Sequence, residues 1–166
     1  VGQPLSNLGL PLAVRLDHQC IAGDIDNDGD EDVFLCEGGL QGAGSQPIVT
    51  QNFLFVNSGN GTFTEQSAAR GVAASADYYS ASFFDYDRDG WLDLYVANYV
   101  DYFPSTKCNA RDGRVDYCSP SAFEGTPDKL YHNITGQLPR DSGQVRFEDV
   151  SVSSTIARPR RSGLGW

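Results

Sequence analysis

The sequence contains no methionine, not even at position 1, and only two histidines. It has no apolar run near the roughly 18–20 residues that a transmembrane helix needs, and no secretory signal peptide at its start. We therefore expect a mature or processed part of a longer precursor. Basic residues are also few, since 12 Lys and Arg stand against 22 Asp and Glu. The chain therefore lacks the basic surface that phosphate recognition requires, which argues against a nucleic-acid partner.

Almost all of the net charge of this 166-residue chain, which is -10, lies in two nine-residue windows. Residues 24–32 carry -6, and residues 85–93 carry -3 after Arg88 is counted. Both windows fit the pattern D-x-D-x-D-G-x-x-D and begin 61 residues apart, which indicates an internal repeat. The hydrophobic content of 40% is too high for a disordered acidic tail and suffices for one domain with an apolar core.

Strand-forming residues flank both windows. β-branched, aromatic and small residues occupy 20–23 and 81–84 before the windows, and 33–35 and 94–96 after them. Each window is therefore predicted to be the loop of a β-hairpin.

Alternating carboxylates in a tight loop can converge on one point, and Ca²⁺ takes six to eight oxygen ligands at about 2.3–2.6 Å. The sequence therefore predicts two Ca²⁺ sites, one in each loop. The expected ligands are the carboxylates of Asp24, Asp26, Asp28, Asp32, Asp85, Asp87, Asp89 and Asp93, and the backbone carbonyls of Asp30 and Trp91. Without an ion the carboxylates would repel one another, so we expect metal binding and folding to be coupled.

Two other interpretations of the loops are weaker. A solvated acidic turn explains one copy, since Asp, Asn and Gly are common in turns, but two copies with the same carboxylates and glycine favour a metal site. An EF-hand requires Glu at the twelfth position and flanking helices. The twelfth residues here are Leu35 and Val96, and the flanks are strand-like.

Four cysteines in an acidic chain predict disulfides and hence an extracellular, secreted or cell-surface location. Cys20 lies four residues before the first loop and Cys36 four residues after it, and both become alanine (Ala81 and Ala97) in the second repeat. This symmetry favours a Cys20–Cys36 bridge across the hairpin. Cys108 and Cys118 would then close a short loop. A Cys₄ zinc site is the rival interpretation, although its closely spaced cysteine pairs are missing.

Two sequons make Asn60 and Asn133 candidates for glycosylation.

The loops and their apolar flanks resemble FG-GAP/VCBS repeats, the calcium-loop blades of integrin-α-type β-propellers. Residues 93–100 (DLYVANYV), 128–133 (DKLYHN) and 57–64 (NSGNGTFT) are similar to stretches of secreted proteins of the ASPIC/UnbV and cartilage-acidic-protein type. That family also carries a cysteine pair where Cys108 and Cys118 stand. The chain departs from the pattern at Glu31, where an aliphatic residue is usual, and at residues 134–143, which lengthen a turn.

The resemblance implies an all-β fold of antiparallel, propeller-like blades. About two blades fit in the chain, whereas a propeller closes with roughly four to eight. We expect an N-terminal segment at 1–19 that is a candidate exchanged strand, a first repeat at 20–80, a second repeat at 81–161 with a disulfide-closed insertion at 101–127, and the start of a third repeat at 162–166.

Three functions compete at this point. The first is a calcium-binding structural or assembly module that polymerises into filaments, since apolar segments at both ends would present unpaired strand edges to other copies. The second is an adhesion or ligand-binding fragment of a larger propeller, with a protein or carbohydrate partner. A glycan-active enzyme ranks last, because the sequence has none of the common catalytic motifs, and we expect no catalytic residues.

Overall fold

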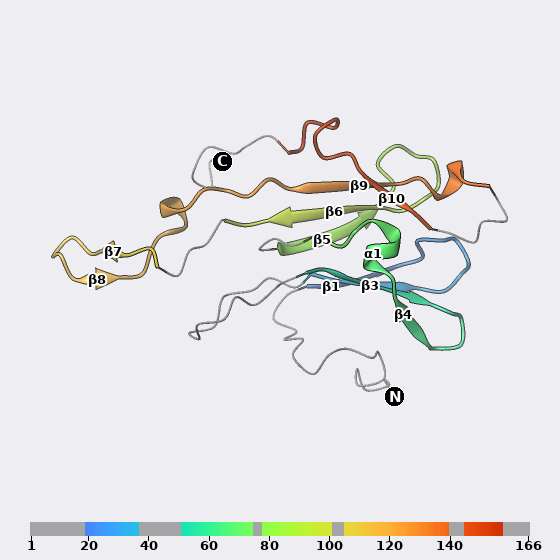
Figure 1. Ribbon diagram of the computed structural model, residues 1–166, viewed down its shortest axis with the longest axis horizontal. Helices are drawn as coiled ribbons and strands as arrows, with labels where there is room; N and C mark the ends of the chain where they lie inside the picture. Colours follow the sequence, from blue (N-terminus) through green and yellow to red (C-terminus); the bar gives the residue numbers. More distant parts are fainter. Residues whose placement is uncertain (1–18, 37–50, 75–77, 101–104, 140–144, 158–166) are drawn as a thin grey trace.

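The computed structural model describes residues 19–36, 51–74, 78–100, 105–139 and 145–157. In this part of the chain two four-stranded antiparallel sheets lie one above the other, and a small two-stranded hairpin projects from one end (Figure 1). The predicted exchanged strand at 1–19 falls almost wholly outside the described residues, and the predicted third repeat at 162–166 falls outside them completely. The expectation of an all-β fold with propeller-like blades is confirmed.

The first sheet holds the first acidic loop between its first two strands. It consists of β1 (Cys20–Gly23), β2 (Asp32–Leu35), β3 (Phe53–Asn57) and β4 (Phe63–Glu65), in that spatial order. A single helical turn, α1 (Ser67–Arg70), follows β4 and ends at Gly71, whose φ of 85° lies in the left-handed region that glycine tolerates.

The second sheet repeats this arrangement. It consists of β5 (Tyr78–Phe84), β6 (Asp93–Asn98), β9 (Lys129–Asn133) and β10 (Phe147–Asp149), with the short helix η3 (Thr135–Gln137) between the last two strands. Cys20 pairs with Leu35 in the first hairpin, and Ala81 pairs with Val96 in the second. Because each position is shifted by 61 residues, the two acidic loops are held in the same strand register.

Apolar side chains fill the space between the two sheets. Phe34 and Leu54 of the first sheet and Leu94 and Val96 of the second are fully buried in one core cluster. The rings of Phe34 and Phe83 meet edge to face with centroids 6.3 Å apart. A Cβ at Gly23 would lie 3.0 Å from the Phe83 ring, so glycine at the end of β1 permits the close approach to β5. This packing brings the two acidic loops side by side.

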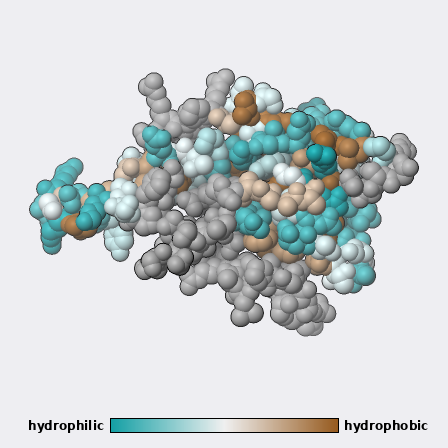
Figure 2. Space-filling view, in the orientation of Figure 1, coloured by the Kyte–Doolittle hydropathy of each residue, from teal (hydrophilic) through white to brown (hydrophobic). Residues whose placement is uncertain are grey.

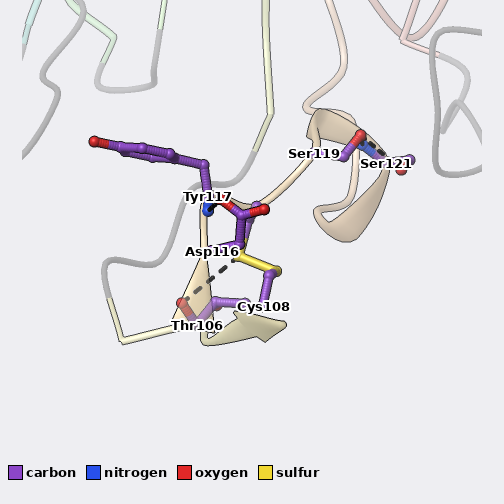
Figure 3. The surroundings of a disulfide bond; sticks show 7 residues. Thr106, Cys108, Asp116, Tyr117, Ser119 and Ser121 are labelled. Atoms are coloured by element: carbon purple, nitrogen blue, oxygen red, sulfur yellow. Dashed lines mark hydrogen bonds between the residues drawn. A yellow bond between two sulfur atoms is a disulfide. The ribbon is translucent and has the colours of Figure 1, made fainter. Parts of the chain in front are cut away.

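The projecting hairpin consists of β7 (Cys108–Asn109) and β8 (Val115–Asp116), followed by η2 (Pro120–Ala122). The predicted Cys108–Cys118 disulfide is confirmed and closes its base (Figure 3). The hairpin surface is mostly hydrophilic (Figure 2). The disulfide therefore supplies the covalent constraint for an arm that has little apolar surface of its own to bury.

The predicted Cys20–Cys36 bridge is not formed, and both residues are free thiols. The difference is one residue of register. Cys20 is the Cα partner of Leu35, while the Cys36 N–H donates to the Gln19 carbonyl at 2.9 Å. Since successive side chains of a strand point to opposite faces, Cys36 points into the core and Cys20 to the other face. Burial raises the pKa of the Cys36 thiol to about 12.

This geometry predicts how the cysteines react. In the native protein a thiol reagent should modify the exposed Cys20, whereas the buried Cys36 should react only after unfolding. Cys108 and Cys118 should react only after reduction. Non-reducing peptide mapping checks the assignment, and recovery of a peptide that links Cys20 to Cys36 would contradict the register described here.

Candidate metal centres

The first acidic loop gathers three carboxylates from the two ends of one hairpin turn. Oxygen atoms of Asp24, Asp26 and Asp32 all lie within 4.8 Å of one another. The Asp24 carboxylate accepts hydrogen bonds from the N–H groups of Asp28 and Gly29, at 3.1 and 3.0 Å. Gly29 adopts a φ of 94°, so a glycine is needed where the chain reverses. The loop sequence thus folds its own carboxylates toward one point.

Burial distinguishes the members of this cluster. Asp32 is buried and accepts the N–H groups of Ile25 and Asn57, at 3.1 and 2.8 Å. One oxygen of Asp26, Oδ1, is buried and has no hydrogen-bond donor among the described residues. Burial, together with the charges of Asp32, Asp28 and Asp24, raises the pKa of Asp26 to about 6. A cation in the loop would satisfy this oxygen and remove the repulsion.

The second loop has the same internal hydrogen bonds. Oxygen atoms of Asp85, Asp87 and Asp89 lie within 4.8 Å of one another. The Asp85 carboxylate accepts the N–H groups of Asp89 and Gly90 at 3.1 and 3.0 Å, and Gly90 has a φ of 89°. Asp93 is fully buried and accepts the Tyr86 N–H at 3.0 Å, as Asp32 accepts that of Ile25 in the first loop. The donor set of both loops is carboxylate oxygen, which suits Ca²⁺.

The other predicted ligands lie outside the two three-carboxylate clusters described above. Asp28 lies outside the first three-carboxylate cluster, and its carboxylate accepts the Asp30 N–H at 2.9 Å. Asp93 groups with Asp87 rather than with Asp85. The side chain of Asp30 turns toward Gly59, where an added Cβ would lie 2.6 Å from its carboxylate. The indole of Trp91 lies against Gly136. The side chains of Asp30 and Trp91 therefore pack against neighbouring turns.

Asn133 joins the two loops, a role that was not predicted from the sequence. Its side-chain amide donates to the Ile25 carbonyl of the first loop at 2.9 Å and to the Leu92 carbonyl of the second at 3.0 Å. Its backbone N–H donates to Asp93 at 2.8 Å. A second link runs from the Asn27 side chain to the Gly90 carbonyl at 3.1 Å. The two candidate centres are therefore parts of one hydrogen-bonded unit.

This role overturns one glycosylation prediction. Asn133 is 0% exposed, and the amide nitrogen that would carry a glycan donates to both loops. Asn60 lies in an exposed turn, where its side-chain oxygen accepts the Thr62 N–H at 2.9 Å. It remains a candidate. A signal for Asn133 was present in the sequence, since an asparagine, Asn57, also ends the matching strand of the first repeat.

Loss of the Asn133 side chain, which links the two loops, should lower the free energy of unfolding more than loss of the Asn57 side chain at the matching position of the first repeat. Asn133→Ala leaves two carbonyls without their donor and should cost about 1–3 kcal/mol of unfolding free energy. Asn57→Ala is the matched control, since Asn57 donates only within its own repeat, to the Glu31 carbonyl. Urea unfolding of both variants measures the difference, and equal losses would contradict a link between the loops.

The raised pKa of Asp26 predicts the pH dependence of the metal-free protein. Because the folded-state pKa of about 6 exceeds the ordinary 3.8, protonation of Asp26 favours folding. Its contribution is fully present below about pH 4 and is lost as the pH rises through about 6. In EDTA at pH 7, Asp26→Asn should therefore raise the melting temperature, while Asp28→Asn, at an exposed position, should change it less. A lower melting temperature for Asp26→Asn in EDTA would contradict this expectation.

Comparison with known proteins identifies part of the chain. No curated protein matches it significantly. None of the helices that the structure describes is long and apolar enough to cross a membrane. A match is found with a family model that covers both acidic loops and the strands between them. Residues 24–96 contain an FG-GAP-like repeat.

Proposed function

We propose that this chain is a calcium-stabilised structural module of an extracellular protein, built from two FG-GAP-like blades. The observation that carries the proposal is that each of two loops in the same strand register gathers three carboxylates, with a buried oxygen of Asp26 left without a donor among the described residues. Ca²⁺ bound at both loops would add +4 to the chain's net charge of -10, at the two places where the negative charge is concentrated. Its role would be to hold the hairpins, and through Asn133 the two sheets, in place.

The extracellular location is supported by the Cys108–Cys118 disulfide. The finer resemblance to secreted proteins of the ASPIC/UnbV and cartilage-acidic-protein type rests on the sequence stretches at 57–64, 93–100 and 128–133. All three coincide with described strands or turns that frame the loops. We propose a role in structure rather than in catalysis, because the carboxylates best placed for acid–base chemistry are assigned to the ions.

Calcium titration of the metal-stripped full chain tests the proposal. About two Ca²⁺ ions should bind per chain, and binding should raise the melting temperature, since each site stabilises by about 2.7 kcal/mol when free calcium is 100 times its dissociation constant. Asp26→Asn should remove one site and Asp87→Asn the other. Identical melting temperatures in EDTA and in excess calcium would contradict the proposal.

Assembly is the second proposed property. The described residues form two four-stranded sheets, whereas a closed propeller needs at least four. Further blades would come from other copies of the chain, giving a polymer, or from the rest of a longer propeller chain. A ligand-binding role with a protein or carbohydrate partner is the alternative that the larger propeller would favour.

Native mass measurement in calcium separates these assemblies. A polymer of this chain predicts species larger than 18.0 kDa whose amount grows with concentration, and electron microscopy should then show filaments. A monodisperse monomer at high concentration would contradict polymerisation and leave the longer propeller. EDTA should dissociate the polymer if the loops position the contacting strands.

A further inference from the structure

His132 stands beside the second acidic loop, on β9. Its Nδ1 atom lies 3.1 Å from Asp93 Oδ1 and 3.7 Å from Asp87 Oδ2. One ligand atom of each of these residues lies within 4.8 Å of the others. The cluster contains a nitrogen donor, so its chemistry differs from that of a purely acidic loop.

We propose that Asp87, Asp93 and His132 form a mixed nitrogen–oxygen site for a divalent transition metal such as Zn²⁺. The site rests on the proposed function only in sharing Asp87 and Asp93 with the second calcium centre. Zn²⁺ binds histidine nitrogen and carboxylate oxygen at about 2.0–2.2 Å. Two ligand atoms in a tetrahedral site of that size are about 3.4 Å apart, and the observed separations of 3.1 and 3.7 Å fall on either side of this value.

The histidine and Asp93 are held in position by neighbours. The other ring nitrogen, Nε2, lies 3.2 Å from the side-chain amide nitrogen of Gln137. With Nδ1 on a metal, Nε2 would carry the proton, and a half-turn of the Gln137 amide would place its oxygen there to accept it, as a polar partner orients a ligating histidine. The Tyr86 ring meets the imidazole edge to face at 5.6 Å. Asp93 is fixed by the N–H groups of Tyr86 and Asn133. The site needs little rearrangement to accept an ion.

The three ligand side chains differ in how far they are exposed to solvent. The side chain of Asp93 is fully buried, that of His132 is 12% exposed and that of Asp87 is 34% exposed. An ion can therefore enter from the Asp87 side, and water can complete its coordination there. Buried donors on one side and solvent on the other are typical of a metal site with an open position.

The first repeat offers no such nitrogen. Val33 pairs with Phe55 in the first sheet and Leu94 with Tyr131 in the second, so Val56 occupies the position that corresponds to His132. Val56 is a buried core residue. The first loop is therefore an all-oxygen site suited to Ca²⁺, whereas the second can also take a metal that prefers imidazole. The two repeats differ in metal preference through one residue outside the loop motif.

Zinc titration of the metal-stripped full chain tests the inference. His132→Ala should weaken Zn²⁺ binding on the order of tenfold or more, since even changes to partners of metal ligands cost about 10–100-fold, and it should leave the first calcium site unchanged. Asp26→Asn is the matched control in the first loop and should leave Zn²⁺ binding unchanged. Co²⁺ should give visible absorption bands with the wild type that His132→Ala loses.

The zinc experiment and the calcium titration can fail independently of each other. Equal Zn²⁺ affinity of wild type and His132→Ala would overturn the inference, and His132 would then only donate a hydrogen bond to Asp93. Where His132→Ala does not fold, NMR of the wild type decides, since Zn²⁺ should shift the His132 imidazole resonances and an unshifted spectrum overturns the site. Zinc binding without calcium binding would contradict the proposed function and leave this inference standing.

Discussion

Carboxylates that converge on one point repel one another, and the described structure is arranged around two such points. Asp24, Asp26 and Asp32 converge in one loop, and Asp85, Asp87 and Asp89 in the other. Backbone N–H groups offset part of this repulsion, but burial and the charges of the neighbouring carboxylates still raise the pKa of Asp26. A bound cation would offset both costs, and we therefore propose that the ions are part of the fold and not additions to it.

The loops lie where the two sheets meet, so whether they are ordered affects the packing of the sheets as well as the loops themselves. Asn133 connects Ile25, whose N–H is held by Asp32, with Asp93 of the second loop. The chain of hydrogen bonds thus runs from the innermost carboxylate of one centre to that of the other. The Phe34–Phe83 contact lies in the same interface. Order in either loop therefore supports the packing of both sheets.

The loops and their strands could be predicted from the sequence because they depend on local patterns. The alternating aspartates, the glycine and the apolar flanks lie within about 17 residues, and β1 runs from Cys20 to Gly23 as the flank suggested. The Cys20–Cys36 pairing failed because a symmetric count around a loop does not fix whether opposite residues share a face. His132 could not be placed beside Asp93 from the sequence, since 39 residues separate them and only the pairing of β9 with β6 brings them together.

We propose that one divalent cation organises each acidic loop. A crystal structure of the full chain grown in calcium, with anomalous data to identify the ions, would show whether each loop holds one. We expect one ion per loop, at about 2.3–2.6 Å from its oxygen ligands, with Asp26 Oδ1 among the ligands of the first ion. Ordered loops that hold only water at saturating calcium would contradict it.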